Sequence, residues 1–173
     1  MFLIFISVGH SPTPLLKIIS HARTYTQLHI QIVFAVKGRQ NGIPAIHRPL
    51  LHQYITSVLQ KDDHKLLAIF CMPDHIHFLA GLNPDIAISD MVLNVKRAST
   101  NFINEEKLVA SHFHWQRGYG AFAYTKSHVP GVINYILNQE EHHRKQTFRQ
   151  EYTTFLKKFE IEYDEKYLFE FYD

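Results

Sequence analysis

Two histidines separated by one apolar residue are the most reactive feature of the sequence, in the segment from Pro73 to Leu79. Successive side chains of an extended strand point to opposite faces, so His75 and His77 would share one face. The other face would carry apolar side chains toward a core: Ile76, Phe78, Ala80 and Leu82. Two imidazoles on one face make half of a metal site, which needs a third ligand from elsewhere in the chain. The alternative is that both histidines are partly exposed strand residues without a ligand.

Composition describes a globular chain of 173 residues, with 46% hydrophobic and 20% charged residues, and favours a single domain. The net charge of +2, with 13 histidines counted as neutral, is compatible with a nucleic-acid partner but is not evidence for one. The single cysteine, Cys71, excludes an intrachain disulfide and a cysteine-based zinc site. No apolar run approaches the length of a membrane span, so we expect no membrane partner and a cytoplasmic protein.

The first 24 residues differ in character from the rest. Their apolar start, from Met1 to Val8, is short and lacks the positive region of a secretory signal, and prolines 12 and 14 then interrupt regular structure. We expect residues 1–24 to be an extension outside the core, and a signal peptide is the less favoured alternative. Residues 25–147 should form the main domain, and residues 148–173 a helix and tail that pack on this domain or on a partner.

Hydrophobic periodicity predicts an alternation of strands and helices. Strand-like patterns cover residues 28–36, 65–72, 75–82 and 112–124, and helical patterns follow Pro49, start at a cap formed by Ser89 and Asp90, and cover residues 129–146 and 148–159. This order predicts an α+β fold, a ferredoxin-like or RRM-like antiparallel sheet with helices on one face plus a C-terminal helix. The two histidines would lie on a central strand.

The helix predicted over residues 129–146 carries a second group of polar side chains. At 100° per residue, Tyr135, Gln139, His142 and Gln146 line up along the edge of its buried stripe. The amide oxygen of Gln139 would suit Mg²⁺ or Mn²⁺, and Tyr135 lies one turn away as a possible nucleophile toward an atom polarised by that metal. The alternative is a tyrosine that only packs at the edge of an amphipathic helix.

Three segments together resemble the HUH-type single-tyrosine transposases, the small transposases of bacterial insertion sequences and REP-associated elements. They are His75 to His77, Phe113 to Phe122 and Asn134 to His143, and the resemblance extends from about Tyr25 to Tyr167. It implies an HUH catalytic domain over residues 25–147. It also implies that His75, His77 and Gln139 hold Mg²⁺ or Mn²⁺, and that Tyr135 is the nucleophile.

The reaction implied by this resemblance is the cleavage and rejoining of single-stranded DNA through a 5′-phosphotyrosine link, without ATP. The DNA would have hairpin ends, and the protein would be a homodimer with active sites shared between subunits. A tyrosine has a high pKa, so a neighbouring group must help to remove its proton. His142 or His143 is a candidate, although their position on a polar surface explains both equally simply.

DNA contacts are expected from scattered cations and aromatic rings. The candidates are Lys37, Arg39, Lys96, Arg97, Arg117, Trp115 and Tyr119. Core packing explains Trp115 at least as well, and a solvated helix face explains Lys96 and Arg97. Two rival functions remain open: a non-catalytic nucleic-acid binder on an RRM-like sheet, and an HUH nuclease that processes host DNA without moving an element.

Overall fold

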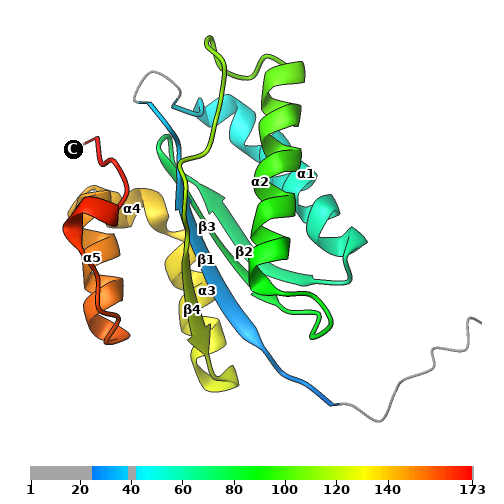
Figure 1. Cartoon of the computed structure of the whole chain (residues 1–173), viewed down its shortest axis with the longest axis vertical. Helices are drawn as coiled ribbons and strands as arrows, with labels where there is room; N and C mark the ends of the chain where they lie inside the picture. The colour runs from blue at the N-terminus through cyan, green and yellow to red at the C-terminus, as the bar shows by residue number, and fades with distance from the viewer. Residues whose placement is uncertain (1–24, 39–41, 173) are drawn as a thin grey trace, which may run out of the picture.

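A four-stranded antiparallel sheet forms the centre of the computed structural model, which describes residues 25–38 and 42–172. Its strands are β1 (His29–Ala35), β2 (Lys65–Cys71), β3 (His75–Gly81) and β4 (Gly120–Tyr124), in the spatial order β2-β3-β1-β4 (Figure 1). β3 is therefore a central strand, as the alternation of apolar residues around the two histidines predicts. The predicted α+β fold is confirmed, whereas the expected extension, residues 1–24, lies outside the described residues.

Helices α1 (Arg48–Lys61) and α2 (Ile88–Glu105) cover one face of the sheet. The apolar side of β3 packs against them, because Ile76, Phe78 and Ala80 belong to the same core cluster as buried residues of both helices. The predicted cap of α2 is wrong. The helix begins after Ala87, which makes no side-chain capping bond, and Asp90 lies in the first turn, where its charge favours the helix dipole.

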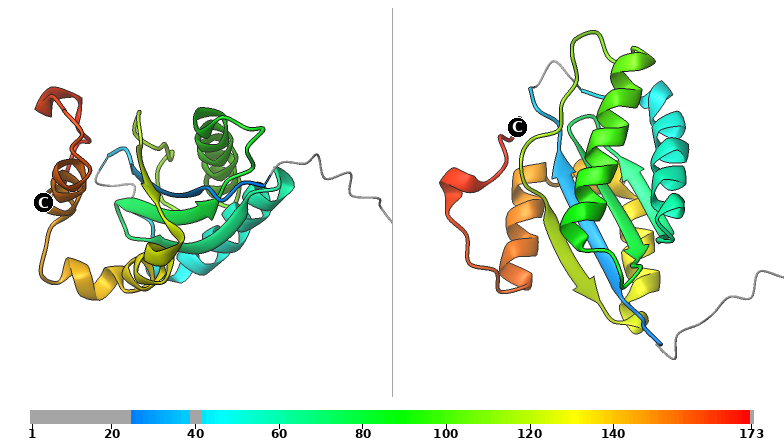
Figure 2. Two further views of the ribbon diagram at one scale, coloured as in Figure 1. Left: turned by 90° about the horizontal axis from the view of Figure 1, so that it is seen from below. Right: turned by 45° about the vertical axis from the view of Figure 1, so that its right-hand side comes forward.

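The opposite face of the sheet carries α3 (Val129–Leu137), which Figure 2 shows on the other side from α2. Val132 and Ile136 of this helix pack on Ala68 and Leu79. The predicted continuous helix over residues 129–146 is wrong. Asn138 adopts φ −102° and ψ 24°, and its side chain donates to the carbonyl oxygen of Asn134 at 2.8 Å.

The chain continues from this break as the short helix α4 (Gln139–His143), followed by α5 (Phe148–Lys158) beside the β4 edge (Figure 1). A capping box between Thr147 and Gln150 starts α5. Phe155 then stacks on Phe122 of β4, with ring centroids 4.9 Å apart. Gly120 allows this approach, since a Cβ atom there would lie 2.9 Å from the ring of Tyr152.

The C-terminal tail lies on the body of the same chain. Gln116 accepts from the Glu170 backbone nitrogen at 2.8 Å and donates to its carbonyl oxygen at 2.8 Å. Phe169 packs on Tyr152, with ring centroids 4.8 Å apart. Three short 3₁₀ helices complete the described fold: residues Ala45–His47, Lys126–His128 and Glu165–Tyr167. No helix in residues 25–38 and 42–172 is long and apolar enough to cross a membrane.

Candidate metal and nucleophile site

The two histidines of β3 lie side by side on the sheet face that carries α3. Strand pairing puts His75 opposite Ala35 and His77 opposite Val33, and both imidazole side chains are buried. The His75 ring also stacks on Phe148 of α5, with centroids 3.9 Å apart and planes 3° from parallel. The predicted common orientation of the pair is therefore present, and α5 closes over it.

Asp74 fixes the orientation of the His75 ring. Its Oδ1 atom lies 2.8 Å from His75 Nδ1, so the carboxylate accepts the Nδ1 proton and leaves Nε2 with a free lone pair. Burial lowers the pKa of His75, although Asp74 opposes the shift, which favours this neutral form. Within the described part of the chain, Nε2 is buried and has no hydrogen-bond partner.

A short polar chain also orients His77, but here Nδ1 accepts the hydrogen bond, so a neutral ring carries its proton on Nε2. The Gln31 amide nitrogen donates to His77 Nδ1 at 3.0 Å, and the Tyr124 hydroxyl donates to Gln31 Oε1 at 3.0 Å. The remaining ring nitrogen, Nε2, faces the Glu151 carboxylate at 3.2 Å. Both strand histidines thus have an anchored Nδ1 and an Nε2 that points into the same space.

Glu151 of α5 occupies the centre of that space and is only 2% exposed. Its Oε2 atom lies 3.2 Å from Nε2 of His77, 3.2 Å from Nε2 of His143 and 3.7 Å from Nε2 of His75. Its Oε1 atom accepts from Gln139 Nε2 at 2.9 Å. Burial alone would raise the pKa of Glu151, but the neighbouring histidines, His77 foremost, hold that pKa well below its usual range.

Sequence reasoning missed Glu151, although the sequence contains a signal. The buried stripe of α5 consists of Phe148, Glu151, Tyr152, Phe155 and Leu156. A carboxylate that is buried within an apolar stripe must be paired, so its place in the stripe predicts cationic or hydrogen-bonding partners. Sequence reasoning also weighed His143 only as a proton acceptor, while its side chain is 9% exposed and contacts Glu151.

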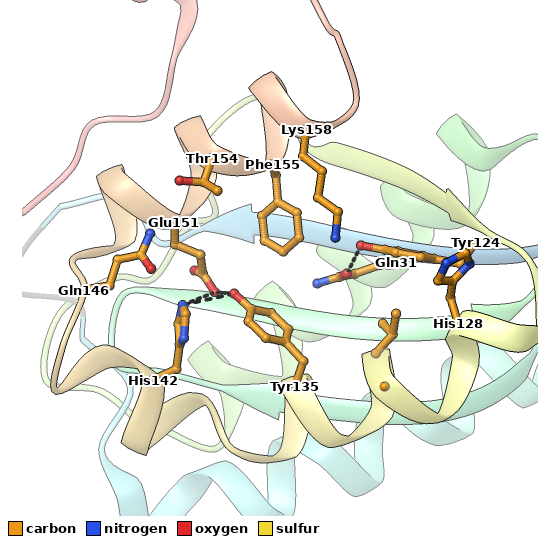
Figure 3. Close-up of a pocket in the computed structure, with 12 residues that line it drawn as sticks. Gln31, Tyr124, His128, Tyr135, His142, Gln146, Glu151, Thr154, Phe155 and Lys158 are labelled. Carbon is orange, nitrogen blue, oxygen red and sulfur yellow. Dashed lines mark hydrogen bonds and ion pairs between the residues drawn. The ribbon is translucent and has the colours of Figure 1, made fainter.

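Tyr135 of α3 points its hydroxyl group at the same carboxylate. The hydroxyl donates to Glu151 Oε1 and lies 3.3 Å from His142 Nε2, as Figure 3 shows. Burial raises the pKa of Tyr135, and the negative charge of Glu151 raises it further. The hydroxyl is therefore protonated at rest, with a carboxylate and an imidazole beside it as proton acceptors.

A cavity of about 330 Å³ opens beside Tyr135, between α3, α5 and the sheet (Figure 3). Gln31 and Tyr124 line its sheet side, and Phe155 and Lys158 line its α5 side. Tyr135 and Glu151 also border this cavity, whereas His75 and His77 do not. Tyr135 therefore lies between the open cavity and the buried histidine pair.

The donor set fits a metal ion. Ligand atoms of His75, His77, His143 and Glu151 lie within 4.8 Å of one another, and the free Nε2 of His75 is one of them. Imidazole nitrogen and carboxylate oxygen are common ligands of divalent ions. This buried group can therefore bind a metal. Gln139 contacts two of its members, since it donates to Glu151 and its Oε1 accepts from His143 Nε2 at 3.0 Å.

The candidate DNA contacts separate into exposed and structural positions. Lys37 and Arg117 line one cavity of about 500 Å³ together with Lys166. Arg97 is exposed on α2, and Tyr119 is 37% exposed. The remaining candidate, Arg39, lies outside the described residues.

Trp115 and Lys96 instead hold the core together. The Trp115 ring packs edge-on against Phe34, with centroids 4.7 Å apart, and its Nε1 donates to Ser99 Oγ at 2.9 Å. Lys96 Nζ donates to the carbonyl oxygen of Gln116 at 2.8 Å and lies 4.9 Å from the Phe34 ring centre. Burial lowers the pKa of Lys96 to about 8. Trp115 is therefore a core residue, as the core-packing alternative predicts.

Comparison with known proteins connects this site to one family. The family model described as "Transposase IS200 like" matches residues 24–139. A candidate transposase from Deinococcus radiodurans R1 is 21% identical with a TM-score of 0.54, covering 68% of this chain and 95% of that chain. A REP-associated tyrosine transposase bound to a REP hairpin is 17% identical with a TM-score of 0.54, covering 71% of this chain and 73% of that chain. These two likenesses show a common fold, and a search of curated proteins gave no match.

Lys96 and Arg97 are neighbouring cations on α2, and they test the distinction between structural positions and exposed DNA-contact candidates. We expect Lys96→Met to lower the free energy of unfolding by about 1.5–3 kcal/mol, the usual worth of hydrogen bonds to a charged group. Arg97→Ala should change it by less than about 0.5 kcal/mol, as is usual for exposed positions, and weaken binding of single-stranded DNA. Urea denaturation and a DNA-binding titration measure the two effects, and a stable Lys96→Met protein with weakened DNA binding would contradict the structural role.

Proposed function

Because this chain belongs to the family of IS200-like transposases, we propose that it cleaves and rejoins single-stranded DNA through Tyr135, in the bacterial cytoplasm. One observation carries the proposal. The Tyr135 hydroxyl and the two strand histidines meet at the same buried carboxylate, Glu151, beside an open cavity. A nucleophile, proton acceptors and a group able to hold a cation thus lie within reach of one phosphate.

The proposed reaction is an in-line transesterification. As the Tyr135 oxygen forms its bond to phosphorus, the hydroxyl proton passes to His142, and the bond from phosphorus to the 3′ oxygen breaks. The proton then reaches the departing 3′ oxygen, which leaves a 5′-phosphotyrosine and a free 3′-OH. A 3′-OH that attacks the link reverses these steps and rejoins DNA, so the bond energy is retained and no ATP is needed.

For the metal, we propose Mg²⁺ or Mn²⁺ held by His75 and His77, with Gln139 as the third donor that the family resemblance implies. When bound, such an ion polarises the phosphate and stabilises the charge of the transition state. Asp74 supports this role because it accepts the Nδ1 proton of His75 and leaves Nε2 free, while Gln31 fixes the orientation of the His77 ring so that its Nε2 also points toward the shared space.

For the DNA partner, we propose a single strand with hairpin ends. One of the structures with the same fold is bound to a REP hairpin. In this chain, Lys37 and Arg117 line one cavity and carry positive charge for backbone phosphates, whereas Lys166, in the same cavity, pairs with Asp164 at 2.6 Å. Host DNA processing without transposition would use the same residues and is the alternative.

The first prediction of this proposal concerns the nucleophile. Tyr135→Phe removes one oxygen atom and little volume, so folding and DNA binding should persist while the covalent protein–DNA adduct disappears. Denaturing gel electrophoresis with end-labelled single-stranded DNA measures the adduct. Tyr163→Phe, at a tyrosine that is 39% exposed, is the control and should retain it. An adduct formed by Tyr135→Phe would assign the nucleophile elsewhere.

The second prediction concerns the metal. His75→Ala or His77→Ala should abolish cleavage, and a chelator should do the same to the unchanged protein. Gln139→Ala should reduce cleavage less, because water can replace one ligand of a hard cation. His112→Ala, at an exposed histidine, is the control. Full cleavage in the presence of chelator would contradict a metal-dependent reaction.

Assembly is the third part of the proposal. A homodimer with shared sites remains a prediction, but a single chain already brings Tyr135 and His77 together, with ring centroids 6.2 Å apart. Val132 and Ile136 also hold α3 on its own sheet. We therefore favour sites completed within each subunit, whether or not the chains form pairs.

Mixing two inactive variants distinguishes the arrangements. Co-expressed His75→Ala and Tyr135→Phe chains should show no recovery of cleavage, because every site within a subunit carries one defect. Differently tagged chains, isolated as proven heterodimers, make the result interpretable. Recovery of part of the unmodified activity would instead establish sites that are shared across subunits.

A further inference from the structure

We propose that His143 and Glu151 are metal ligands together with His75 and His77, and that this four-donor site selects Mn²⁺ over Mg²⁺. The inference deepens the proposed function, on which it rests for the use of the metal. The family match ends at residue 139, so both added ligands lie beyond it.

The first observation that supports these ligands is that three imidazole rings converge on one oxygen atom of Glu151. Nε2 atoms of His75, His77 and His143 surround Glu151 Oε2 at 3.7, 3.2 and 3.2 Å. Each ring comes from a different backbone position, yet each presents the same nitrogen. The carboxylate oxygen can accept hydrogen bonds from His77 and His143, but His75 Nε2 lies too far away to donate to it, and a common cation would engage all three nitrogens.

Outer contacts hold these rings in the orientation that ligands need. His75 Nδ1 donates to Asp74, and His143 Nδ1 donates to the carbonyl oxygen of Gln146 at 3.0 Å. Hydrogen bonding at Nδ1 keeps the proton there and leaves Nε2 for a metal, which is the usual arrangement around metal-bound histidine. His143 shares this support at Nδ1, but its Nε2 also donates a proton to Gln139 Oε1, so a bound metal ion would have to displace that proton.

Burial supplies the second support. Side chains of His75, His77 and Glu151 are at most 2% exposed, and that of His143 is 9% exposed. Within the described residues, His75 Nε2 is buried and has no hydrogen-bond partner, although ion pairs surround it. Burying a polar atom without a hydrogen bond costs free energy. A shared cation would satisfy this nitrogen and balance the buried carboxylate.

In this four-donor site Gln139 is a positioning residue and not the third donor that the family resemblance implies. Its nitrogen donates to Glu151 Oε1 at 2.9 Å and its oxygen accepts from His143 Nε2 at 3.0 Å, so both ends of the amide hold proposed ligands. Imidazole nitrogens suit transition-metal ions, and of the two ions in the proposed function only Mn²⁺ belongs to that series. Mg²⁺ prefers oxygen ligands and retains water, so this nitrogen-rich site should bind it poorly.

The test measures metal binding without DNA, using the full chain. Mn²⁺ is titrated into the protein, and loss of the free-ion electron paramagnetic resonance signal reports binding. Glu151→Gln and His143→Ala should each weaken Mn²⁺ binding by more than about 100-fold, and Gln139→Ala by about tenfold, as for residues that orient ligands. Glu141→Gln and His112→Ala change exposed residues and should have no effect. Circular dichroism without metal verifies folding of each variant.

Competition with Mg²⁺ completes the test, and Mg²⁺ should displace bound Mn²⁺ only at more than about 100-fold excess. Unchanged Mn²⁺ affinity in folded Glu151→Gln or His143→Ala protein would overturn the ligand assignment. A larger loss in Gln139→Ala than in Glu151→Gln would overturn it as well, and displacement by equal Mg²⁺ would overturn the selectivity. Failure of the proposed function differs from all of these, since it gives tight Mn²⁺ binding without a DNA adduct.

Discussion

The carboxylate of Glu151 is the constraint on which the site depends. A buried carboxylate costs several kcal/mol unless it is paired and hydrogen-bonded. Glu151 meets this requirement with partners from separate elements, since one oxygen faces the β3 histidines and the other faces Tyr135 and Gln139. The same interaction therefore fixes the distance between the sheet, the α3–α4 segment and α5. Removing any one partner therefore leaves the negative charge of Glu151 less well compensated by the partners that remain.

The surrounding architecture serves to bring α5 to this point. The capping box at Thr147 starts the helix, and the close contact over Gly120 and Phe122 sets it against β4. The break at Asn138 lets the chain leave the sheet surface and run toward α5 (Figure 1). A straight helix through residue 146 would continue along the direction of α3 instead. The irregularity thus contributes to placing His142 and His143 beside Tyr135 and Glu151.

Local patterns predicted the elements but not the contacts between distant ones. Alternation identified β3 and the common face of its histidines, and helical spacing identified Tyr135 as a candidate. Glu151 is 74 residues from His77, and no local period connects them. Lys96 and Arg97 look alike in sequence, yet only the fold shows that Lys96 donates to the Gln116 carbonyl. The predicted cap at Ser89 was wrong because propensity alone does not decide where a helix begins.

The positions of the charged groups also restrict how a DNA phosphate can approach Tyr135 through the open cavity. Tyr135 and Glu151 border the open cavity, whereas the strand histidines lie behind them. A phosphate that approaches Tyr135 therefore meets the negative charge of Glu151 first, and like charges at short range in a buried site repel strongly. The histidines behind the carboxylate, and any cation that they hold with it, are what can offset that repulsion. Tyr135 and the group that can bind a cation are consequently not independent parts of this fold, because the same carboxylate contacts both.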